Sequence, residues 1–521
     1  MLKRYRWGAA VAGLLASLTA VPAAAQAAPT RPATIPALQQ WTPASGAFRL
    51  SAAPRILLRP QDAPRLRSDA AVFAADLRSL TGRTAHVVVT NARARGGDIA
   101  LQLGATSLGQ EGYTLTIGSS VSIRAKASAG AFYGTRTVLQ LLKQNTTIPA
   151  GHALDQPRYP ERGLMMDIGR KPYSYDWLAD RVRDMAYLKL NYLHLHFSDD
   201  EGWRIESKQG LQSETFLTKK QVRDLVQLAA RYHVTVVPEI DMPGHMGAAL
   251  AKHPEFQLKD ANGVARPTKL DYSIPAARKF LRDLVTEYLP LFPGPYWHMG
   301  ADEFLGEDEF ANYPQLEQYA KQTYGPSATA IDGIHGLIND MNKLVRAHGK
   351  TLRVWNDTLI PGTTVAVDKN VIVEWWTDTN TPIPSTNPKT PQQLLDEGYT
   401  IQNSSFLPTY DYAENGFPLP PAITNMYEEW TVNRFHGFIY FDGSGTGSPW
   451  YDVAASEPRL RGSAVHFWSN PAVWTQDEVA ASIYPRLRVM AQKTWESPPL
   501  TTTYADFEPI VAAVGSAPGV S

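Results

Sequence analysis

The sequence predicts an α/β fold: a (β/α)8 TIM barrel preceded by a small α+β domain. Strand-like and helix-like segments alternate after Pro160, the order that produces parallel strands surrounded by helices. Polar and ionisable side chains gather directly after the strand-like segments, where such barrels carry their chemistry. The chain has 521 residues, which is long enough for a barrel and one further domain.

Residues 1–27 have the pattern of a cleaved secretory signal peptide. Lys3, Arg4 and Arg6 precede an uncharged run over residues 8–20, and small residues lead up to Ala27, as in signals that are removed on export. We therefore expect cleavage near Ala27 and a secreted, extracellular protein. No stretch reaches about 18 uninterrupted apolar residues, so no membrane span is expected.

Residues 28–155 precede the barrel and divide into two parts. Pro, Ala and Thr dominate residues 28–47, which predicts an extended, poorly packed lead-in. Residues 48–155 predict a small α+β accessory domain, because short β-like runs are followed by an amphipathic helix over about 129–143. The β-like runs cover residues 55–59, 86–90, 98–102, 113–117 and 121–124.

Residues 156–497 predict the catalytic barrel, and residues 498–521 a C-terminal tail. The strand segments are 163–168, 192–197, 234–240, 296–300, 352–355, 371–375, 399–402 and 463–468. Amphipathic helices are expected over about 175–190, 220–232, 276–288, 331–348 and 476–494, with Ser174 as the N-cap of the first. The region over about 410–460 is rich in aromatic residues and Gly, and predicts a loop that shapes the pocket.

The strand ends carry side chains that suit a sugar ligand. They are Asp167 and Arg170, Asp199 and Asp200, Asp241 and His245, Asp302 and Glu303, Trp355 to Asp357, Trp375 and Trp376, and Trp468 to Asn470. Indole rings stack on the apolar faces of sugars, and charged groups bind their hydroxyls. Adjacent Asp302 and Glu303 can supply a general acid, because a dry pocket and a neighbouring anion both keep a carboxyl group protonated. Gly300 predicts a break in the strand pleat that lets both side chains enter one pocket.

Composition argues against several other functions. The chain has 50 Lys and Arg against 50 Asp and Glu, so no overall charge attracts nucleic acid. It has no cysteine, which excludes disulfides, thiolate metal sites and a cysteine nucleophile. His194 and His196 share a strand face as a metal pair would, but no third ligand is obvious, and hydrogen-bonded histidines in the barrel wall are favoured. We expect no metal and no cofactor.

Four motifs carry a resemblance to a known family. They are Arg162 to Arg170 (RGLMMDIGR), Leu193 to Arg204 (LHLHFSDDEGWR), Pro238 to His245 (PEIDMPGH) and His298 to Glu303 (HMGADE). In this order they resemble the β-N-acetylhexosaminidases and lacto-N-biosidases of glycoside hydrolase family 20. The resemblance covers roughly residues 48–495 and implies a retaining mechanism in which the substrate's own 2-acetamido oxygen is the nucleophile.

The resemblance also implies roles for individual residues. Glu303 would protonate the leaving oxygen and then activate water, Asp302 would orient the acetamido group, and Asp199 and His245 would support Glu303. Arg170 would bind sugar hydroxyls with its fixed fork of donors. The remaining expected substrate contacts are the aromatic walls Trp355, Trp376 and Trp468, with Trp375 as the alternative to Trp376, and Tyr410 as a donor to the acetamido carbonyl.

Two positions depart from the family pattern. Asn470 stands where the family has a glutamate, and Tyr412 where it usually has an acid or Asn; both are expected to contact the substrate. Gly300 to Glu303 also matches the variant motif of the family's lacto-N-biosidases. Three hypotheses follow: an exo-glycosidase removing terminal β-linked N-acetylhexosamine from an oligosaccharide, a lacto-N-biosidase releasing a galactosyl-N-acetylglucosamine disaccharide, or an inactive carbohydrate-binding barrel.

Overall fold

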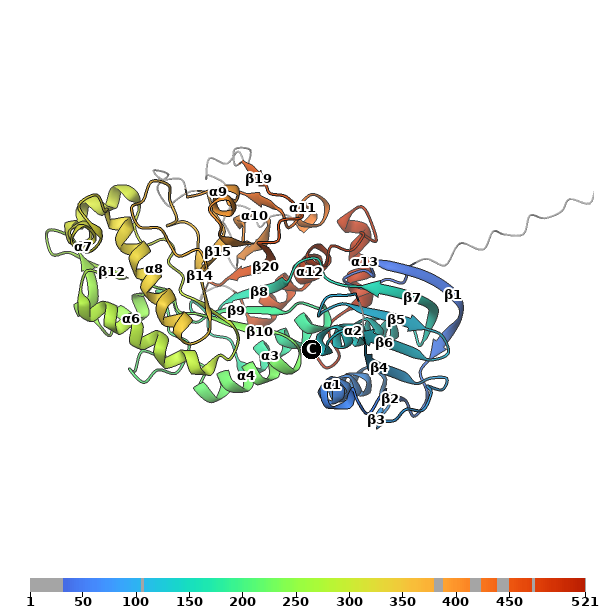
Figure 1. Ribbon diagram of the computed structural model, residues 1–521. Coiled ribbons are helices and arrows are strands. Elements are labelled where there is room, and N and C mark those ends of the chain that lie inside the picture. The colour runs from blue at the N-terminus through green and yellow to red at the C-terminus, as the bar shows by residue number, and fades with distance from the viewer. Residues whose placement is uncertain are drawn as a thin grey trace, which may run out of the picture.

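The computed structural model describes residues 31–104, 107–378, 388–412, 423–437, 449–470 and 474–520. Figure 1 shows a barrel surrounded by helices, with a smaller sheet domain against one side of it. The signal peptide expected over residues 1–27 lies outside the described residues.

The barrel is a closed ring of parallel strands, as the sequence predicts. Its strands are β8 (Glu161–Asp167), β9 (Tyr192–His196), β10 (Thr235–Glu239), β13 (Tyr296–His298), β14 (Thr351–Trp355), β15 (Ile372–Trp375), β16 (Thr400–Asn403) and β20 (Leu460–Trp468). The ring closes because β20 pairs with both β16 and β8. Continuous apolar runs form these strands since both of their faces are buried. The carboxyl ends of the strands therefore meet at one mouth.

Helices cover the outside of the barrel. They are α3 (Tyr175–Tyr187), α4 (Lys219–Arg231), α5 (Gly247–Leu250), α6 (Pro275–Tyr288), α7 (Pro314–Tyr324), α8 (Ala330–Ala347), α9 (Pro391–Asp396), α10 (Phe406–Thr409), α11 (Ile423–Glu428) and α12 (Gln476–Trp495). The Ser174 hydroxyl accepts a hydrogen bond from the Trp177 amide, which confirms the predicted N-cap of α3. The apolar stripe of this predicted helix, formed by Leu178, Val182, Met185 and the following Leu188, is fully buried. Short strands β11 (Gln257–Lys259), β12 (Ala265–Leu270), β17 (Tyr410–Tyr412), β18 (Arg434–His436) and β19 (Trp450–Asp452) complete this body.

The small domain is a seven-stranded sheet with helices α1 (Ala63–Thr81) and α2 (Ser128–Gln144). The strands are β1 (Gln40–Arg49), β2 (Arg55–Leu58), β3 (His86–Val89), β4 (Ile99–Leu103), β5 (Tyr113–Ile117), β6 (Val121–Ala125) and β7 (Thr147–Asp155). Their order in the sheet is β1-β7-β5-β6-β4-β2-β3. The five predicted strands are all present, and α2 matches the helix predicted over about 129–143. The domain has two helices, as expected, and β1 and β7 are additional strands.

The lead-in expected over residues 28–47 is extended from Gln40 onward, but its first described part is well packed, and there the expectation of poor packing is wrong. Ile35 and Leu38 are fully buried, and the Ile35 amide donates to Gln140 Oε1 at 2.8 Å. Residues from Gln40 onward form β1, which pairs antiparallel with β7 at the sheet edge. An edge strand exposes most of its side chains, as β1 does, and so lacks the alternation that reveals a half-buried strand.

The C-terminal segment is also more ordered than a tail. Helix α13 (Tyr504–Val514) buries Phe507, Val511 and Val514, and the Tyr187 hydroxyl of α3 donates to the Val514 carbonyl at 2.9 Å. The segment thus joins α3 and α12 to α2 of the small domain.

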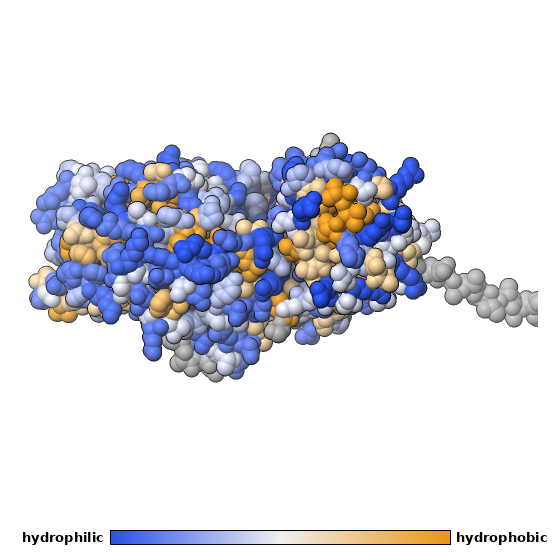
Figure 2. Space-filling model, turned by 90° about the horizontal axis from the view of Figure 1, so that it is seen from below, coloured by the Kyte–Doolittle hydropathy of each residue, from blue (hydrophilic) through white to orange (hydrophobic). Residues whose placement is uncertain are grey.

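Among the helices that the structure describes, none is long and apolar enough to cross a membrane. Hydrophilic residues cover most of the face in Figure 2, with separate apolar patches between them.

Candidate functional site

A cavity of about 320 Å³ lies at the mouth formed by the carboxyl ends of the barrel strands. Ten of the eleven predicted site residues line it: Arg170, Asp199, His245, Asp302, Glu303, Trp376, Tyr410, Tyr412, Trp468 and Asn470. They come from the ends of six barrel strands and from the short strand β17. Closure of the barrel brings residues 170 and 468 to the same mouth. His196, Asp241 and Ser469 also line the cavity. Asp241 and Ser469 are among the predicted strand-end residues, whereas His196 was expected in the barrel wall.

The turn after β13 places Asp302 and Glu303 in the same cavity. Gly300, Ala301 and Glu303 all have positive φ, at 71°, 73° and 45°, so the regular alternation of a strand ends here. This confirms the predicted break at Gly300. Positive φ is costly for residues with a Cβ, and such strain persists where the surrounding structure imposes it.

Replacing Gly300 by Ala should damage both stability and activity. A Cβ on Gly300 would lie 1.7 Å from Asp241 Oδ1, so the turn that carries Asp302 and Glu303 must shift. We expect a lower melting temperature and at least about a tenfold loss of turnover. Gly349→Ala is the matched control: Gly349 has φ of 72°, but nothing lies within 4 Å of its added Cβ. Equal effects of the two substitutions would show that backbone strain alone, and not the collision, matters.

The side chains of Glu303 and His245 are in contact at the mouth. His245 Nε2 lies 3.2 Å from Glu303 Oε2, and His245 Nδ1 lies 3.3 Å from Asp199 Oδ1. Burial on its own lowers the pKa of His245, but the Asp199 charge and the contacts to both carboxylates raise the pKa well above its usual value. The two neighbouring carboxylates thus favour the cationic form of His245. Glu303 keeps 38% of its side chain exposed, so a ligand can reach it.

Asp199 is held by three cationic groups. Arg170 Nη2 lies 2.9 Å and His196 Nε2 lies 2.7 Å from Asp199 Oδ2, while His245 contacts the other oxygen. Burial raises the pKa of Asp199, yet Arg170, His245 and His196 together hold it well below its usual value. Arg170 also donates to Asp167 Oδ2 at 3.0 Å. These contacts fix the orientation of the Arg170 guanidinium at the cavity wall.

Asp302 lies deeper than Glu303. Only 8% of the residue is exposed, and its Oδ1 has no hydrogen-bond partner among the described residues. Burial raises the pKa of Asp302; Glu239 and Glu303 add to the rise, whereas His245 opposes it. Leaving a buried carboxylate oxygen without a hydrogen bond lowers the stability of the fold. This oxygen is therefore suited to accept a hydrogen bond from a ligand N–H.

Two further carboxyl groups hold the turn in place. The Ala301 amide donates to Asp241 Oδ1 at 3.2 Å, and the Glu303 amide donates to Asp357 Oδ2 at 2.7 Å. Burial, together with the Asp302 charge, raises the pKa of Asp357 to about 8 and that of Asp241 well above its usual value. Asp241 and Asp357 follow the ends of β10 and β14, so their positions in the sequence mark them as residues of the barrel mouth.

Aromatic rings form the wall opposite the carboxylates. Trp376 and Tyr410 are stacked, with ring centroids 6.3 Å apart and planes inclined by 16°. Tyr410 and Tyr412 point to the same side because they are two residues apart in β17, while Asp411 points away to accept from the Ser482 hydroxyl at 2.7 Å. This wall offers flat apolar surfaces with hydroxyl groups at their edges.

Trp355 differs from the expectation. It is 1% exposed, does not line the cavity, and donates its indole N–H to Glu239 Oε1 at 2.8 Å. It packs beneath the wall in an apolar cluster with Trp376 and Tyr410. Trp355 is the last residue of β14 and points into the barrel, whereas Trp376 follows the end of β15 and reaches the mouth. Trp375, the alternative to Trp376, donates to the Lys389 carbonyl instead and does not line the cavity.

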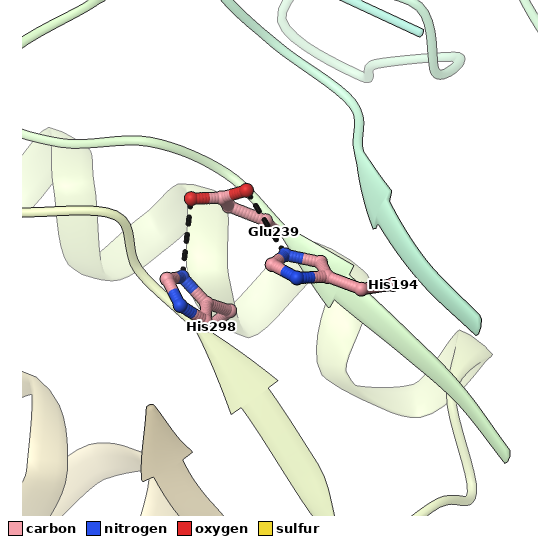
Figure 3. Close-up of side chains that lie close together, drawn as sticks. All are labelled: His194, Glu239 and His298. Carbon is pink, nitrogen blue, oxygen red and sulfur yellow. Dashed lines mark ion pairs between the residues drawn. The ribbon is translucent and has the colours of Figure 1, made fainter. Parts of the chain in front are cut away.

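The histidine pair on β9 is part of a buried network in the barrel. Figure 3 shows Glu239 between His194 and His298, with Glu239 oxygens 3.0 Å from His194 Nε2 and 3.1 Å from His298 Nδ1. The same carboxylate accepts from His196 at 2.6 Å and from Trp355. These side chains are close enough to share a metal ion. His196 fits the predicted hydrogen-bonded barrel wall, since both of its ring nitrogens are hydrogen-bonded. Neither ring nitrogen of His194 has a hydrogen-bond partner among the described residues.

Comparison with known proteins identifies the family of the chain. The family model "Glycosyl hydrolase family 20, catalytic domain" matches residues 159–498, and "Glycosyl hydrolase family 20, domain 2" matches residues 31–156. A lacto-N-biosidase of Bifidobacterium bifidum is 33% identical over 495 residues, which are 93% of this chain and 42% of the relative. A β-N-acetylhexosaminidase of Cellulomonas fimi is 33% identical over 288 residues, or 50% of this chain and 58% of the relative. The chain thus spans about half the length of these relatives.

Solved structures share the fold. A β-N-acetylhexosaminidase of Bacteroides fragilis superposes with a TM-score of 0.74 at 19% identity, covering 92% of this chain and 96% of the other. The corresponding enzyme of Streptomyces coelicolor gives 0.69 at 24% identity, covering 92% and 94%. With two family models matched along the chain and a barrel mouth built from the predicted motifs, the chain belongs to glycosyl hydrolase family 20.

Proposed function

We propose that the protein is an exported retaining exo-glycosidase that hydrolyses terminal β-linked N-acetylhexosamine by substrate-assisted catalysis. The observation that carries the proposal is the pairing of an accessible Glu303 beside cationic His245 with a buried Asp302 whose Oδ1 lacks a partner among the described residues. One carboxyl group can exchange a proton with the medium, and the other can bind a positively polarised N–H in a site with little water. Export rests on the leader pattern of residues 1–27.

The reaction is proposed to proceed in two steps. Glu303 donates its proton to the glycosidic oxygen as the 2-acetamido oxygen of the substrate attacks the anomeric carbon, and an oxazolinium ion forms. Asp302 binds the acetamido N–H and stabilises the positive charge that develops on the ring. Glu303, now an anion, then takes a proton from water, which opens the oxazolinium ion with net retention. The cation at His245 stabilises the Glu303 anion between the two steps.

The cavity walls supply the binding contacts. Trp376, Tyr410 and Trp468 offer flat surfaces for the acetamido methyl and the sugar ring. Arg170, which Asp167 and Asp199 hold in position, offers paired donors to neighbouring hydroxyls. The expected ligand is therefore an uncharged amino sugar at the end of an oligosaccharide.

A single pair of substrates tests the mechanism. The protein should cleave an aryl β-N-acetylglucosaminide and should cleave the matching aryl β-glucoside at least about 10³-fold more slowly, because the 2-hydroxyl cannot replace the acetamido nucleophile. Release of the aryl alcohol is measured at matched concentrations. Comparable rates on the two would rule out the substrate-assisted mechanism.

Lacto-N-biosidase activity is the second candidate. It is favoured by the 33% identity to a lacto-N-biosidase that extends over 93% of this chain, and by Tyr412 and Asn470 in the cavity wall at the two positions that depart from the family pattern. Aryl lacto-N-bioside and aryl β-N-acetylglucosaminide, compared by kcat/KM, separate the candidates. A preference for the disaccharide would identify a lacto-N-biosidase without altering the roles of Asp302 and Glu303.

A further inference from the structure

Glu239, the last residue of β10, is fully buried inside the barrel. Ring nitrogens surround both of its carboxylate oxygens. Oε1 lies 2.8 Å from Trp355 Nε1 and 3.1 Å from His298 Nδ1, and Oε2 lies 2.6 Å from His196 Nδ1 and 3.0 Å from His194 Nε2. Figure 3 shows two of these rings on either side of the carboxylate. Hydrogen bonds from Trp355 on β14 and His196 on β9 hold Glu239 in position, and the His194 and His298 rings lie against it.

In this network Glu239 and His196 are charged, whereas His194 is neutral. Burial raises the pKa of Glu239, but the imidazoles, His196 first, hold it well below its usual value. Burial lowers the pKa of His196, yet Glu239 and Asp199 raise it well above the usual value. Burial lowers the pKa of His194, so that ring is neutral. Glu239 is thus an anion whose cationic partner is His196.

From Glu239 a series of direct contacts leads to the cavity. His196 Nε2 lies 2.7 Å from Asp199 Oδ2, Asp199 Oδ1 lies 3.3 Å from His245 Nδ1, and His245 Nε2 lies 3.2 Å from Glu303 Oε2. The members alternate in sign from Glu239 to His245. None of the first four is more than 9% exposed, so little solvent screens the interactions between them.

We propose that Glu239 is a positioning residue for the acid Glu303 and acts through His196, Asp199 and His245. The inference rests on the proposed function, because it requires Glu303 to be the proton donor. Glu239 keeps His196 cationic and oriented, so that both ring N–H groups donate and Asp199 presents its other oxygen to His245. Without the Glu239 charge, His196 loses its counter-ion, Asp199 can rotate, and Glu303 is no longer held in line with the leaving oxygen. A small displacement there is enough to slow proton transfer.

Glu239→Gln tests this, because it keeps the shape of the side chain and removes the charge. The readout is kcat/KM on aryl β-N-acetylglucosaminides with a poor leaving group (phenol) and a good one (2,4-dinitrophenol). We expect a loss of about tenfold or more on the phenyl substrate and of less than about threefold on the dinitrophenyl substrate, because dinitrophenolate departs without a proton. A merely structural defect lowers both values equally.

Two further variants make the test decisive. Glu161→Gln is the matched control: Glu161 is also a buried barrel glutamate, but it pairs with Arg353 at 3.0 Å at the start of β8. Its effect should be the same on both substrates. His196→Gln removes the next residue in the series. If circular dichroism shows that Glu239→Gln is unfolded, His196→Gln tests the same proposal and should show the same dependence on the leaving group.

The outcomes separate the inference from the proposed function. If the wild-type protein cleaves neither aryl substrate, the proposed function fails. If the wild type cleaves both, and the folded Glu239 or His196 variant loses equal activity on both substrates or none on either, the positioning role alone is overturned.

Discussion

Glu303→Gln should lower kcat/KM for substrates with poor leaving groups by on the order of 10²-fold or more. The change removes the transferable proton but little volume, so KM should change much less than kcat. The measurement is hydrolysis of a chitobiose-type disaccharide and of an activated aryl β-N-acetylglucosaminide, and the disaccharide should suffer the larger loss. Glu303 is the accessible member of the pair, 38% exposed and 3.2 Å from His245.

The control for this variant is a surface glutamate with a similar partner. Glu255 pairs with His253 at 3.0 Å and is 58% exposed, so Glu255→Gln removes a Glu–His contact away from the cavity. It should leave both kinetic constants unchanged. A Glu303→Gln protein with wild-type activity on the disaccharide would place the acid at another residue.

Asp302→Asn should be comparably severe, with a loss of about 10²-fold to 10³-fold in kcat. The amide keeps the shape of the side chain but removes the negative charge that balances the oxazolinium ion in a buried site. Unlike Glu303→Gln, the loss should persist on activated aryl substrates, because charge stabilisation is needed whichever group leaves. The measurement is kcat on 2,4-dinitrophenyl and phenyl β-N-acetylglucosaminides.

A near-neutral Asp302→Asn would contradict the proposed role of Asp302. Asp260→Asn provides the control, since Asp260 caps an exposed turn by accepting from the Val264 amide at 2.8 Å. It should not alter turnover. A similar melting temperature for the Asp302 variant and the wild type would show that the loss arises in the chemistry.

The residues at the barrel mouth could be predicted because of the way parallel strands close into a ring. Side chains that directly follow such strands must meet at one end of the barrel, so Arg170, His245 and Trp468 could be grouped before any distance was known. The break in the pleat that lets Asp302 and Glu303 enter one cavity was predictable from Gly300, since its φ of 71° suits a residue without a Cβ. The edge strand β1 and helix α13 were missed because their exposed faces or short apolar runs carry weak periodicity.

Sequence alone thus determined the barrel, the family motifs and the adjacent acid pair, because these follow from local periodicity and from the order of the strands along the chain. Tertiary structure alone decided that Trp355 lies below the cavity and binds Glu239 while Trp376 lines it. It also decided that His196 connects Glu239 to Asp199. Such contacts join side chains from different strands, and their distances depend on the register and closure of the ring, which the spacing of residues along one strand does not encode.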